Sequence, residues 1–290
     1  MNKLPQFPEF APVSLDVKKC LNKYFEKYQP EICELNLGNL LIWKNYDRPK
    51  FTIINNNLCL LCEPTHENRF FYQPIGENKI EETLDICLSY APKLSRAEGS
   101  FVQKYASHLK AEPDRDNFDY VYLSQDLIEL KGKKYDGKRN RIKKFSKSHE
   151  YSYIKLEENH FGECEALFEE WLKSKNYEKW IEDIQRESIK QTVKLFNALN
   201  LTGGAIMVNG KIEAFSVGEK LNNETAVIHF EFASPHFEGL SQVINSEFVK
   251  NEWSGFKFIN REQDLGIPGL RRAKLSYYPD HLVEKFDLRK

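Results

Sequence analysis

The sequence predicts an α+β protein made of two successive units, each with a mixed, mostly antiparallel sheet flanked by helices. The chain has 290 residues, which is long for one hydrophobic core and suits two units of ordinary size. Runs of helical period alternate with short apolar runs of strand type along both halves. Asparagine-rich turns separate several of these apolar runs, a pattern typical of antiparallel hairpins.

The composition is that of a soluble globular protein, with 41% hydrophobic and 29% charged residues. The chain has 42 Lys and Arg against 43 Asp and Glu. No overall field therefore attracts it to nucleic acid or anionic lipid, and such binding requires a local patch. No apolar run reaches the roughly 18 residues that span a bilayer, and the proline-rich start lacks the apolar region of a signal peptide. We expect a cytoplasmic protein without a transmembrane segment.

The six cysteines lack the density of a disulfide scaffold. Cys59 and Cys62 have CxxC spacing, but they lie in an apolar run predicted as a strand, where their sulfurs point to opposite or poorly matched faces. The sequence shows no second such pair and no histidine pair nearby. We therefore expect buried reduced thiols and identify no metal site.

The first half opens with helical patterns at residues 15–28 and 34–43, where apolar side chains recur at helical spacing. Two apolar runs, 51–54 and 58–62, flank three asparagines and predict a hairpin. The remaining expected elements of this half are a strand at 70–73, helices at 80–90 and 100–109, and a strand at 118–123.

Residues 124–147 separate the halves. Ser124 is an N-cap candidate, Gly132 and Gly137 interrupt the helical pattern, and a basic helix follows. We place the domain boundary here, which gives an N-terminal domain of residues 1–135 and a C-terminal domain of residues 136–290 that carries the active site.

Cationic side chains cover most of the basic helix, around a narrow apolar stripe of Ile142 and Phe145. Such a charge run is either a solvated face or a surface that tracks the phosphates of a nucleic acid or a nucleotide carrier. The candidate phosphate-binding residues are Lys138, Arg139, Arg141, Lys143 and Lys144.

The second half predicts a strand, two helices, an antiparallel meander, a helix and a final pair of strands, which is the order of N-acetyltransferase-like (GNAT) folds. Asn209-Gly210 and Asn222-Asn223 mark the turns of the meander. The expected ranges are 151–156, 163–173, 181–199, 204–208, 212–221, 225–232, 240–253, 257–259 and 281–286.

Residues 236–241 correspond to the Q/R-x-x-G-x-G/A loop of GNAT-like folds, whose backbone N–H groups cradle the pyrophosphate of acyl-CoA. Gly239 keeps the motif and Ser241 supplies a small residue, whereas His236 replaces Gln or Arg and Glu238 adds negative charge. The start of the helix that follows offers an anion site.

His229 and Glu231 alternate along the strand 225–232 and are expected to share one face. On that face they could act as a general acid and base toward an amine nucleophile. The alternative is a polar pair whose hydrogen bonds are satisfied within a cleft.

The segment 260–279, NREQDLGIPGLRRAKLSYYP, gathers charges, glycines and aromatic residues between two strands. We expect a loop at 262–267 and a short helix at 269–275, with Leu270 and Ala273 facing inward. Arg271 and Lys274 would then form a positive pocket suited to phosphate or to a developing oxyanion. The alternative is a solvated basic turn paired with acidic residues of the loop. The candidate site residues of the segment 260–279 are Asn260, Arg261, Glu262, Asp264, Arg271, Lys274, Ser276 and Tyr277.

Three stretches taken together, residues 115–147, GGAIMVNGKIEAFSVGE from Gly203, and the segment 260–279, resemble the DUF2156 family. That family is similar to the cytosolic C-terminal domain of phosphatidylglycerol lysyltransferase. The resemblance covers about residues 15–286 and implies two tandem GNAT-like (acyl-CoA N-acyltransferase-like) domains. The sequence shows no match to the membrane-spanning half of a lysyltransferase.

More remotely, the late element Gly269-Leu270-x-x-x-Lys274 and the basic helix resemble the Fem-type peptidyltransferases, which take an aminoacyl group from tRNA. The matching lysine of those relatives stabilises transfer, a role that the resemblance gives to Lys274.

The resemblance implies an enzyme that moves an aminoacyl group from aminoacyl-tRNA to an amine or hydroxyl of a small-molecule, peptide or lipid acceptor, without a tightly bound cofactor. Lys274 and Arg271 would face the oxyanion or a tRNA phosphate, and His229 or Glu231 would assist proton removal. Two alternatives stay open. One is an acyl-CoA N-acyltransferase that uses Gly239 and Ser241, and the other is a non-catalytic ligand- or RNA-binding protein.

Overall fold

The structure is a computed structural model that describes residues 4–175 and 177–290, and the chain divides into two compact units. The first unit contains the chain up to Tyr120, together with Glu262–Arg271 and Leu282–Lys290. The second contains Val121–Arg261 and Arg272–His281. Residue 135 lies inside the second unit, but contact-based units need not coincide with domains of a fold family. The domain boundary at 135 therefore stays a prediction.

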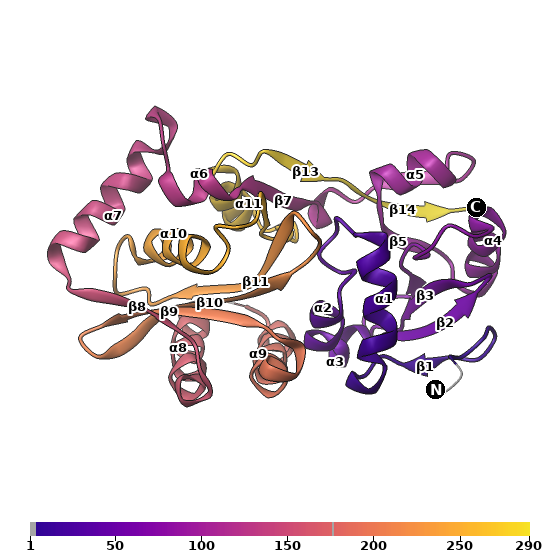
Figure 1. Cartoon of the computed structure of the whole chain (residues 1–290), viewed down its shortest axis with the longest axis horizontal. Coiled ribbons are helices and arrows are strands. Elements are labelled where there is room, and N and C mark those ends of the chain that lie inside the picture. Colours follow the sequence, from indigo (N-terminus) through magenta and orange to yellow (C-terminus); the bar gives the residue numbers. More distant parts are fainter. Residues whose placement is uncertain (1–3, 176) are drawn as a thin grey trace. The chain divides into compact units, whose positions relative to one another are not determined.

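The first unit has a sheet of seven strands in the order β1-β2-β3-β4-β5-β14-β6 (Figure 1). β4 and β5 pair in parallel, and the other neighbours are antiparallel. Asn55 and Asn56 adopt positive φ between β2 and β3, which confirms the expected hairpin. The strands are β1 (Ala11–Pro12), β2 (Lys50–Ile54), β3 (Asn57–Cys62), β4 (Phe70–Phe71), β5 (Leu94–Glu98), β6 (Lys110–Pro113) and β14 (Lys285–Arg289).

Apolar packing holds the helices of the first unit to this sheet. Cys59 of β3 and Leu94 of β5 are fully buried in one cluster with Leu84 and Cys87 of α4. Cys59 and Cys62 are both buried free thiols. The helices are α1 (Lys18–Tyr28), preceded by η1 (Leu15–Val17), α2 (Leu37–Ile42), α3 (Lys44–Asp47), α4 (Ile80–Tyr90), α5 (Gly99–Tyr105) and η2 (Arg115–Asn117).

The second unit has a sheet of seven strands in the order β13-β7-β12-β11-β10-β9-β8. β11 and β12 pair in parallel, whereas β12 and β7, and the strands from β11 to β8, pair antiparallel. The strands are β7 (Asp119–Leu123), β8 (Tyr151–Lys155), β9 (Thr202–Val208), β10 (Lys211–Lys220), β11 (Thr225–Ala233), β12 (Phe258–Asn260) and β13 (His281–Val283).

Helices cover both faces of the second sheet: α10 lies on one face, and α8 and α9 lie on the other (Figure 1). The N-cap role expected of Ser124 is wrong, because its hydroxyl donates to the Phe256 carbonyl and the side chain makes no cap. The helices are α6 (Ser124–Glu129), η3 (Lys133–Tyr135), α7 (Asp136–Ser148), η4 (Glu158–His160), α8 (Phe161–Lys173), α9 (Lys179–Leu199), α10 (Leu240–Glu252) and α11 (Pro268–Leu275).

Both sheets share one plan, in which a parallel strand pair is connected through a helix. In the first sheet the pair is β4 and β5 with α4 between them, and in the second it is β11 and β12 with α10. Each sheet also takes a strand from a distant part of the chain: β14 inserts between β5 and β6, and β7 lies between β12 and β13. The expected α+β class with two mixed sheets is confirmed.

Some elements differ from expectation. β5 and β6 were not expected, and the single strand expected at 281–286 is divided into β13 and β14. Within the described ranges 4–175 and 177–290, no helix combines the length and the apolar character that crossing a bilayer requires.

Candidate functional site

The candidate site of the second unit lies where β11 and β12 part. The two strands pair only through Thr225–Val227 and Phe258–Asn260, and β11 then continues to Ala233 paired with β10 but without β12 beside it. Ligand sites of sheets with parallel strands commonly lie beyond the carboxyl ends of such strands. Glu231 lies on the part of β11 that extends beyond its pairing with β12, and Arg261 follows directly after β12.

Arg261 is the centre of this site. Its Nη2 donates to Glu231 Oε1 at 2.9 Å, and its guanidinium carbon lies 4.9 Å from the ring centre of Tyr277 and 5.6 Å from that of Tyr122. Burial alone would lower the pKa of Arg261, but the Glu231 charge holds it above its ordinary value. Its Nη1 is buried and has no hydrogen-bond partner among the described residues. A buried donor of this kind is costly to leave unpaired, so it marks a place for an acceptor atom.

Lys274 reaches the same place from α11. Only 9% of Lys274 is exposed, and its ammonium donates to the carbonyl of Arg261. The Tyr122 hydroxyl donates to the Lys274 carbonyl at 2.8 Å. The expectation that Ala273 faces inward is wrong: Ala273 is exposed, because the helix turns Lys274 inward to satisfy the Arg261 carbonyl.

The first turn of α7 extends the site. Lys138 Nζ lies 3.8 Å from the ring centre of Tyr277 and donates to Ser276 Oγ at 2.7 Å. Burial, and then the charges of Arg261 and Arg141, lower the pKa of Lys138 to about 8. Lys138 therefore changes charge close to neutral pH.

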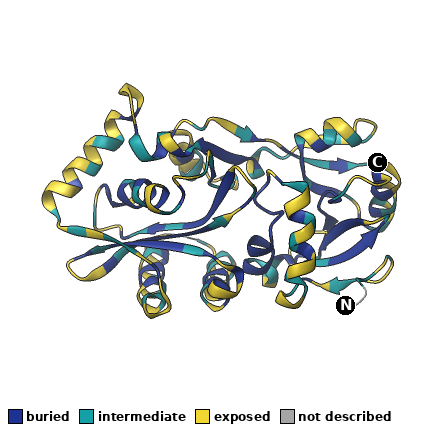
Figure 2. Cartoon of the chain, in the orientation of Figure 1, coloured by how far each residue is buried: buried dark blue, intermediate teal, exposed yellow. Residues whose placement is uncertain are grey.

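The other basic residues of α7 have different surroundings. Arg139 donates to the carbonyls of Leu130 and Gly132, so it braces the turn before the helix. Lys144 pairs with Glu238 at 2.6 Å. Most of α7 is exposed (Figure 2). Arg141 and Lys143 are among its exposed residues, and neither forms an ion pair within the described part of the chain.

A cavity of about 380 Å³ lies at the N-terminus of α10. Gly239 has φ +94 there, and a Cβ on it would lie 2.5 Å from the Arg141 carbonyl oxygen, so only glycine fits. The hydroxyl of Ser234, which lines the cavity, is buried without a hydrogen-bond partner among the described residues. Other residues of its lining are Arg141, Trp171, Lys175, Ser241 and Gln242.

His229 and Glu231 do not share a partner. The pairing of β10 and β11 skips His229, because Gly218 pairs with Ile228 and Val217 pairs with Phe230. This irregularity interrupts the simple alternation from which a common face was expected. His229 Nε2 lies 2.9 Å from Glu219 Oε1, whereas Glu231 binds Arg261 and also accepts from Asn245 Nδ2 at 2.9 Å.

The loop that contains Glu262 and Asp264 belongs to the first unit. Buried Asp264 accepts from Tyr120, from the Gly266 N–H at 2.9 Å and from Arg271 Nε at 2.8 Å. Burial would raise the pKa of Asp264, but these hydrogen bonds, that of Arg271 first, lower it to about 2. Arg271 also pairs with Asp116 at 2.6 Å. Arg271 and Lys274 therefore have separate partners.

Two further residues of the candidate set have contacts of their own. Glu262 has φ +56 and accepts from Asn39 Nδ2 at 3.3 Å. Asn260 is fully buried at the end of β12, where it pairs with Val227 and Val121.

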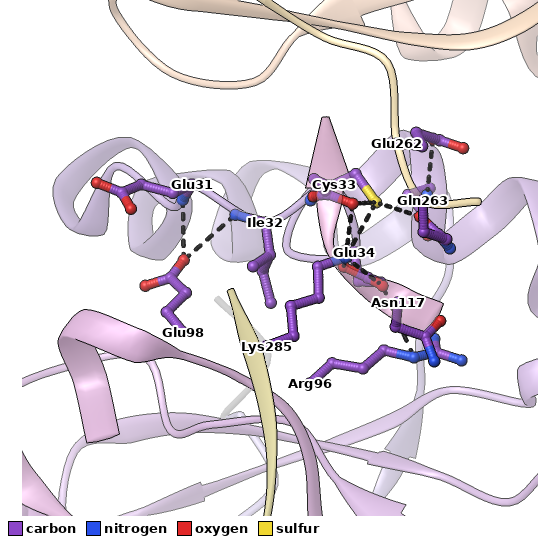
Figure 3. A network of polar contacts seen from close by, with 12 residues as sticks. Glu31, Ile32, Cys33, Glu34, Arg96, Glu98, Asn117, Glu262, Gln263 and Lys285 are labelled. Atoms are coloured by element: carbon purple, nitrogen blue, oxygen red, sulfur yellow. Dashed lines mark hydrogen bonds and ion pairs between the residues drawn. The ribbon is translucent and has the colours of Figure 1, made fainter. Parts of the chain in front are cut away.

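A buried ionic network that was not predicted from the sequence lies in the first unit (Figure 3). The Sγ atom of Cys33 and one carboxylate oxygen each of Glu34 and Asp119 lie within 4.8 Å of one another. These are atom types that commonly bind metal ions. The ammonium of Lys285 contacts Glu34 and Asp119 at 2.7 Å each and lies 3.7 Å from Cys33 Sγ. The protein's own cation thus occupies the position that a metal ion would take. No sequence spacing connects these residues, which lie up to 252 positions apart.

Residues 25–289 match the protein-family model described as "Phosphatidylglycerol lysyltransferase, C-terminal". A curated relative, the uncharacterized protein MYCGA3080 of Mycoplasmoides gallisepticum (strain R(low / passage 15 / clone 2)), is 24% identical over 176 residues. The match covers 58% of this chain and 54% of that protein, so the chain spans about half the length of this relative.

Three solved structures are similar over nearly the whole chain. A conserved protein of unknown function from Bacteroides thetaiotaomicron VPI-5482 is 30% identical, with a TM-score of 0.89 and coverage of 99% of this chain and 100% of the other. L-PGS from Bacillus licheniformis is 14% identical, with a TM-score of 0.65 and coverage of 100% and 94%. FemX is 8% identical, with a TM-score of 0.63 and coverage of 97% of both chains. The last two likenesses show the fold alone, and they confirm the tandem GNAT-like architecture expected from the sequence.

Proposed function

Because the chain belongs to the phosphatidylglycerol lysyltransferase C-terminal family, we propose that it is an aminoacyltransferase that takes its aminoacyl group from aminoacyl-tRNA and passes it to an amine or hydroxyl acceptor. The observation that carries this proposal is Arg261, whose buried Nη1 lacks a hydrogen-bond partner among the described residues at the point where β11 and β12 part. A fixed cationic donor of this kind suits an oxygen that gains negative charge during acyl transfer.

In the proposed reaction, the acceptor nitrogen or oxygen attacks the ester carbonyl that joins the amino acid to the terminal ribose. A new C–N or C–O bond forms, and the ester C–O bond breaks. The Arg261 Nη1 donates to the carbonyl oxygen as it becomes an oxyanion. The ammonium of Lys274, held on the backbone carbonyl of the same arginine, keeps a second positive charge beside it.

Glu231 is the proposed proton acceptor. Its carboxylate already orients Arg261 and is itself oriented by Asn245 of α10. The proton that leaves the acceptor passes to Glu231 and then to the departing ribose oxygen, so the enzyme returns to its starting protonation state. His229, bonded to Glu219, acts in this scheme as support for β11.

Exposed cations of α7 would hold the tRNA. Arg141 and Lys143 are free of ion pairs within the described ranges, and Lys138 lies on Tyr277 beside Arg261. Phosphate contacts of this kind supply affinity without reading sequence.

A second candidate function, acyl-CoA-dependent N-acylation, is favoured by one observation. The cavity at the N-terminus of α10 combines Gly239, at which only glycine fits, with the unpartnered hydroxyl of Ser234. Pyrophosphate could bind to such a helix N-terminus. Against it, Glu238 places a carboxylate beside the cavity.

The deciding experiment compares binding and single-turnover transfer with charged tRNA, uncharged tRNA and acetyl-CoA. Phosphatidylglycerol vesicles, a lysine-containing peptide and a mixture of small amines serve as acceptors. The proposal expects transfer from charged tRNA to at least one acceptor, with binding that weakens as salt rises. Binding of acetyl-CoA in the micromolar range with no binding of tRNA would establish the second candidate. Binding of tRNA without transfer to any acceptor would favour a non-catalytic RNA-binding protein.

A further inference from the structure

The first unit has a cavity beside the carboxyl end of one of its parallel strands. Its parallel strands β4 and β5 pair only at Phe71 and Leu94, and β5 then continues to Glu98. A cavity of about 770 Å³, within the size range of small-molecule sites, has Glu98 in its lining. The carboxyl end of one parallel strand thus lines a cavity in each unit: Glu98 of β5 in the first and Ala233 of β11 in the second.

Glu98 forms the floor of this cavity and is held in one position. It is 3% exposed, and its Oε1 accepts the Glu31 N–H at 2.8 Å and the Ile32 N–H at 3.3 Å (Figure 3). Its Oε2 accepts the Tyr28 hydroxyl at 3.2 Å, and its backbone N–H donates to Gln73 Oε1 at 2.7 Å. Gln73 Nε2 in turn donates to the Tyr28 oxygen at 2.7 Å.

This buried carboxylate has neutral hydrogen-bond donors but forms no ion pair with any Lys, Arg or His of the described chain. The contrast with the neighbouring network is direct, because Glu34 is neutralised there by Lys285. A buried acid without a counter-charge gains more from a cationic ligand than an exposed acid does, since little water competes for it. Consistent with this environment, burial raises the pKa of Glu98.

Positive charge lies at the rim instead. Lys23 and Lys27 of α1 are exposed, line the cavity and form no ion pair within residues 4–175 and 177–290. Lys104 of α5 also lines it and is paired with Glu77 only at 3.7 Å. Tyr24 and Phe101 add aromatic side chains to the lining.

We infer that the first unit binds a zwitterionic small molecule, with its primary ammonium group on Glu98 and its phosphate or carboxylate on Lys23 and Lys27. The charges of Glu98, Lys23 and Lys27 would each meet the opposite charge on the ligand. It does not depend on the proposed transfer reaction in the second unit. The same chemistry is offered by a free amino compound or by the headgroup of an aminophospholipid.

The test uses calorimetric titration of the full chain with O-phosphoethanolamine, ethanolamine and glycerol 3-phosphate. We expect O-phosphoethanolamine to bind at least about tenfold more tightly than either compound that carries only one of its charges. Glu98→Gln keeps the shape of the side chain and should weaken O-phosphoethanolamine binding by about tenfold. The double variant Lys23→Met with Lys27→Met should weaken it by a similar factor. Lys110→Met changes an exposed lysine of the first unit outside the cavity and should leave binding within about twofold.

Ser100→Trp is the second variant, since Ser100 is exposed on the cavity lining and the larger side chain fills the space without touching the hydrogen bonds of Glu98. It should abolish binding while the melting temperature stays near that of the parent. Binding to vesicles that contain phosphatidylethanolamine is compared with binding of L-alanine in solution. Tighter binding to the vesicles would identify the ligand as a lipid headgroup, and tighter binding of L-alanine would identify it as a free amino compound. The inference is overturned if no zwitterion binds at about 10 mM, or if Glu98→Gln binds all probes as the parent does.

Discussion

Lys285 Nζ lies 2.7 Å from Asp119 Oδ1, and both side chains are completely shielded from solvent. The same ammonium lies 2.7 Å from Glu34 Oε2. Asp119 also accepts the backbone N–H of Cys33 at 2.8 Å, so the acid is bonded on both oxygens. One cation thus connects β14, the start of β7 and the segment after α1.

Lys285→Met should destabilise the protein by about 3 to 5 kcal/mol. The change removes the cation and leaves two buried carboxylates without their counter-charge, which costs much more than loss of an exposed pair. The free energy of unfolding in urea measures the effect. Lys290→Met, which removes only an exposed contact with Asp85, is the control and should cost less than about 1 kcal/mol. Similar values for the two variants would contradict the central role of Lys285.

Asp264 should make the stability of the protein depend on acid pH. Its folded pKa of about 2 lies below the ordinary value of 3.8, so the unfolded chain takes up the proton first as the pH falls. The stabilisation is therefore complete above about pH 4 and is lost toward pH 2. Asp264→Asn should cost about 2 kcal/mol at pH 7 and should lack this part of the pH dependence. The free energy of unfolding in urea, measured at pH 7, 4 and 3, tests this pH dependence. The control is Asp16→Asn, which changes an exposed aspartate.

Lys274→Met should lower single-turnover transfer by about a hundredfold or more, equivalent to about 2.7 to 4 kcal/mol, with a smaller effect on donor affinity. A melting curve is needed because the Arg261 carbonyl also loses a hydrogen bond. Tyr122→Phe is the matched control: it removes the hydrogen bond to the Lys274 backbone and leaves the ammonium in place. Unchanged turnover in Lys274→Met would leave this lysine with a structural role only.

Binding of tRNA should lose part of its salt dependence when Arg141 and Lys143 are changed to Glu. Each phosphate contact contributes about 0.7 to 0.9 to the slope of log affinity against log salt, so two contacts contribute about 1.5. Arg139→Glu is a poor test of the same idea, because Arg139 braces the carbonyls of Leu130 and Gly132 and its loss would disturb the fold. Filter binding at several salt concentrations gives the slope, and an unchanged slope would exclude α7 from the interface.

Lys138 should make tRNA binding sensitive to mildly alkaline pH. With a pKa of about 8 it is charged at pH 7 and mostly neutral at pH 9. We expect affinity to fall by about fivefold over this range, which is the loss of about one phosphate contact. Lys138→Met should bind more weakly at pH 7 and change less between the two pH values. Lys143→Met should keep the pH dependence of the parent. If Lys143→Met lost this pH dependence, the titrating group would not be Lys138.

The sequence predicted those helices and strands whose own residues show a clear apolar spacing or a turn signal. The helix α4 and the hairpin of β2 and β3 follow from apolar spacing and from the asparagines at the turn. β6, with the sequence KAEP, carries two charges and a proline and has no strand pattern. It is a strand because β14, far away in the chain, pairs with it.

The candidate site shows the same limit. The residue types of the segment 260–279 indicated a site, but the burial of Lys274 depends on the Arg261 carbonyl, and the loss of alternation at His229 depends on the register between β10 and β11. Glu98 and Lys285 could not be singled out from the sequence, because their importance appears only after folding. Lys285 is then surrounded by two carboxylates, whereas Glu98 is buried with hydrogen-bond donors but no ion-pair partner among the described residues. Partners brought together by tertiary structure carry no spacing signal.

The position of β14 in the first sheet sets an order for folding during translation. Between the end of β7 and the start of β14 the ribosome adds residues 124–284, which takes roughly 10 to 30 s at about 5 to 20 residues per second. Throughout that time β5 and β6 lack the strand that separates them, and Glu34 and Asp119 lack their lysine. The nascent chain therefore exposes unpaired strand edges for many seconds, and such edges promote aggregation. The part of the protein that is synthesised first is thus among the last to reach its native state.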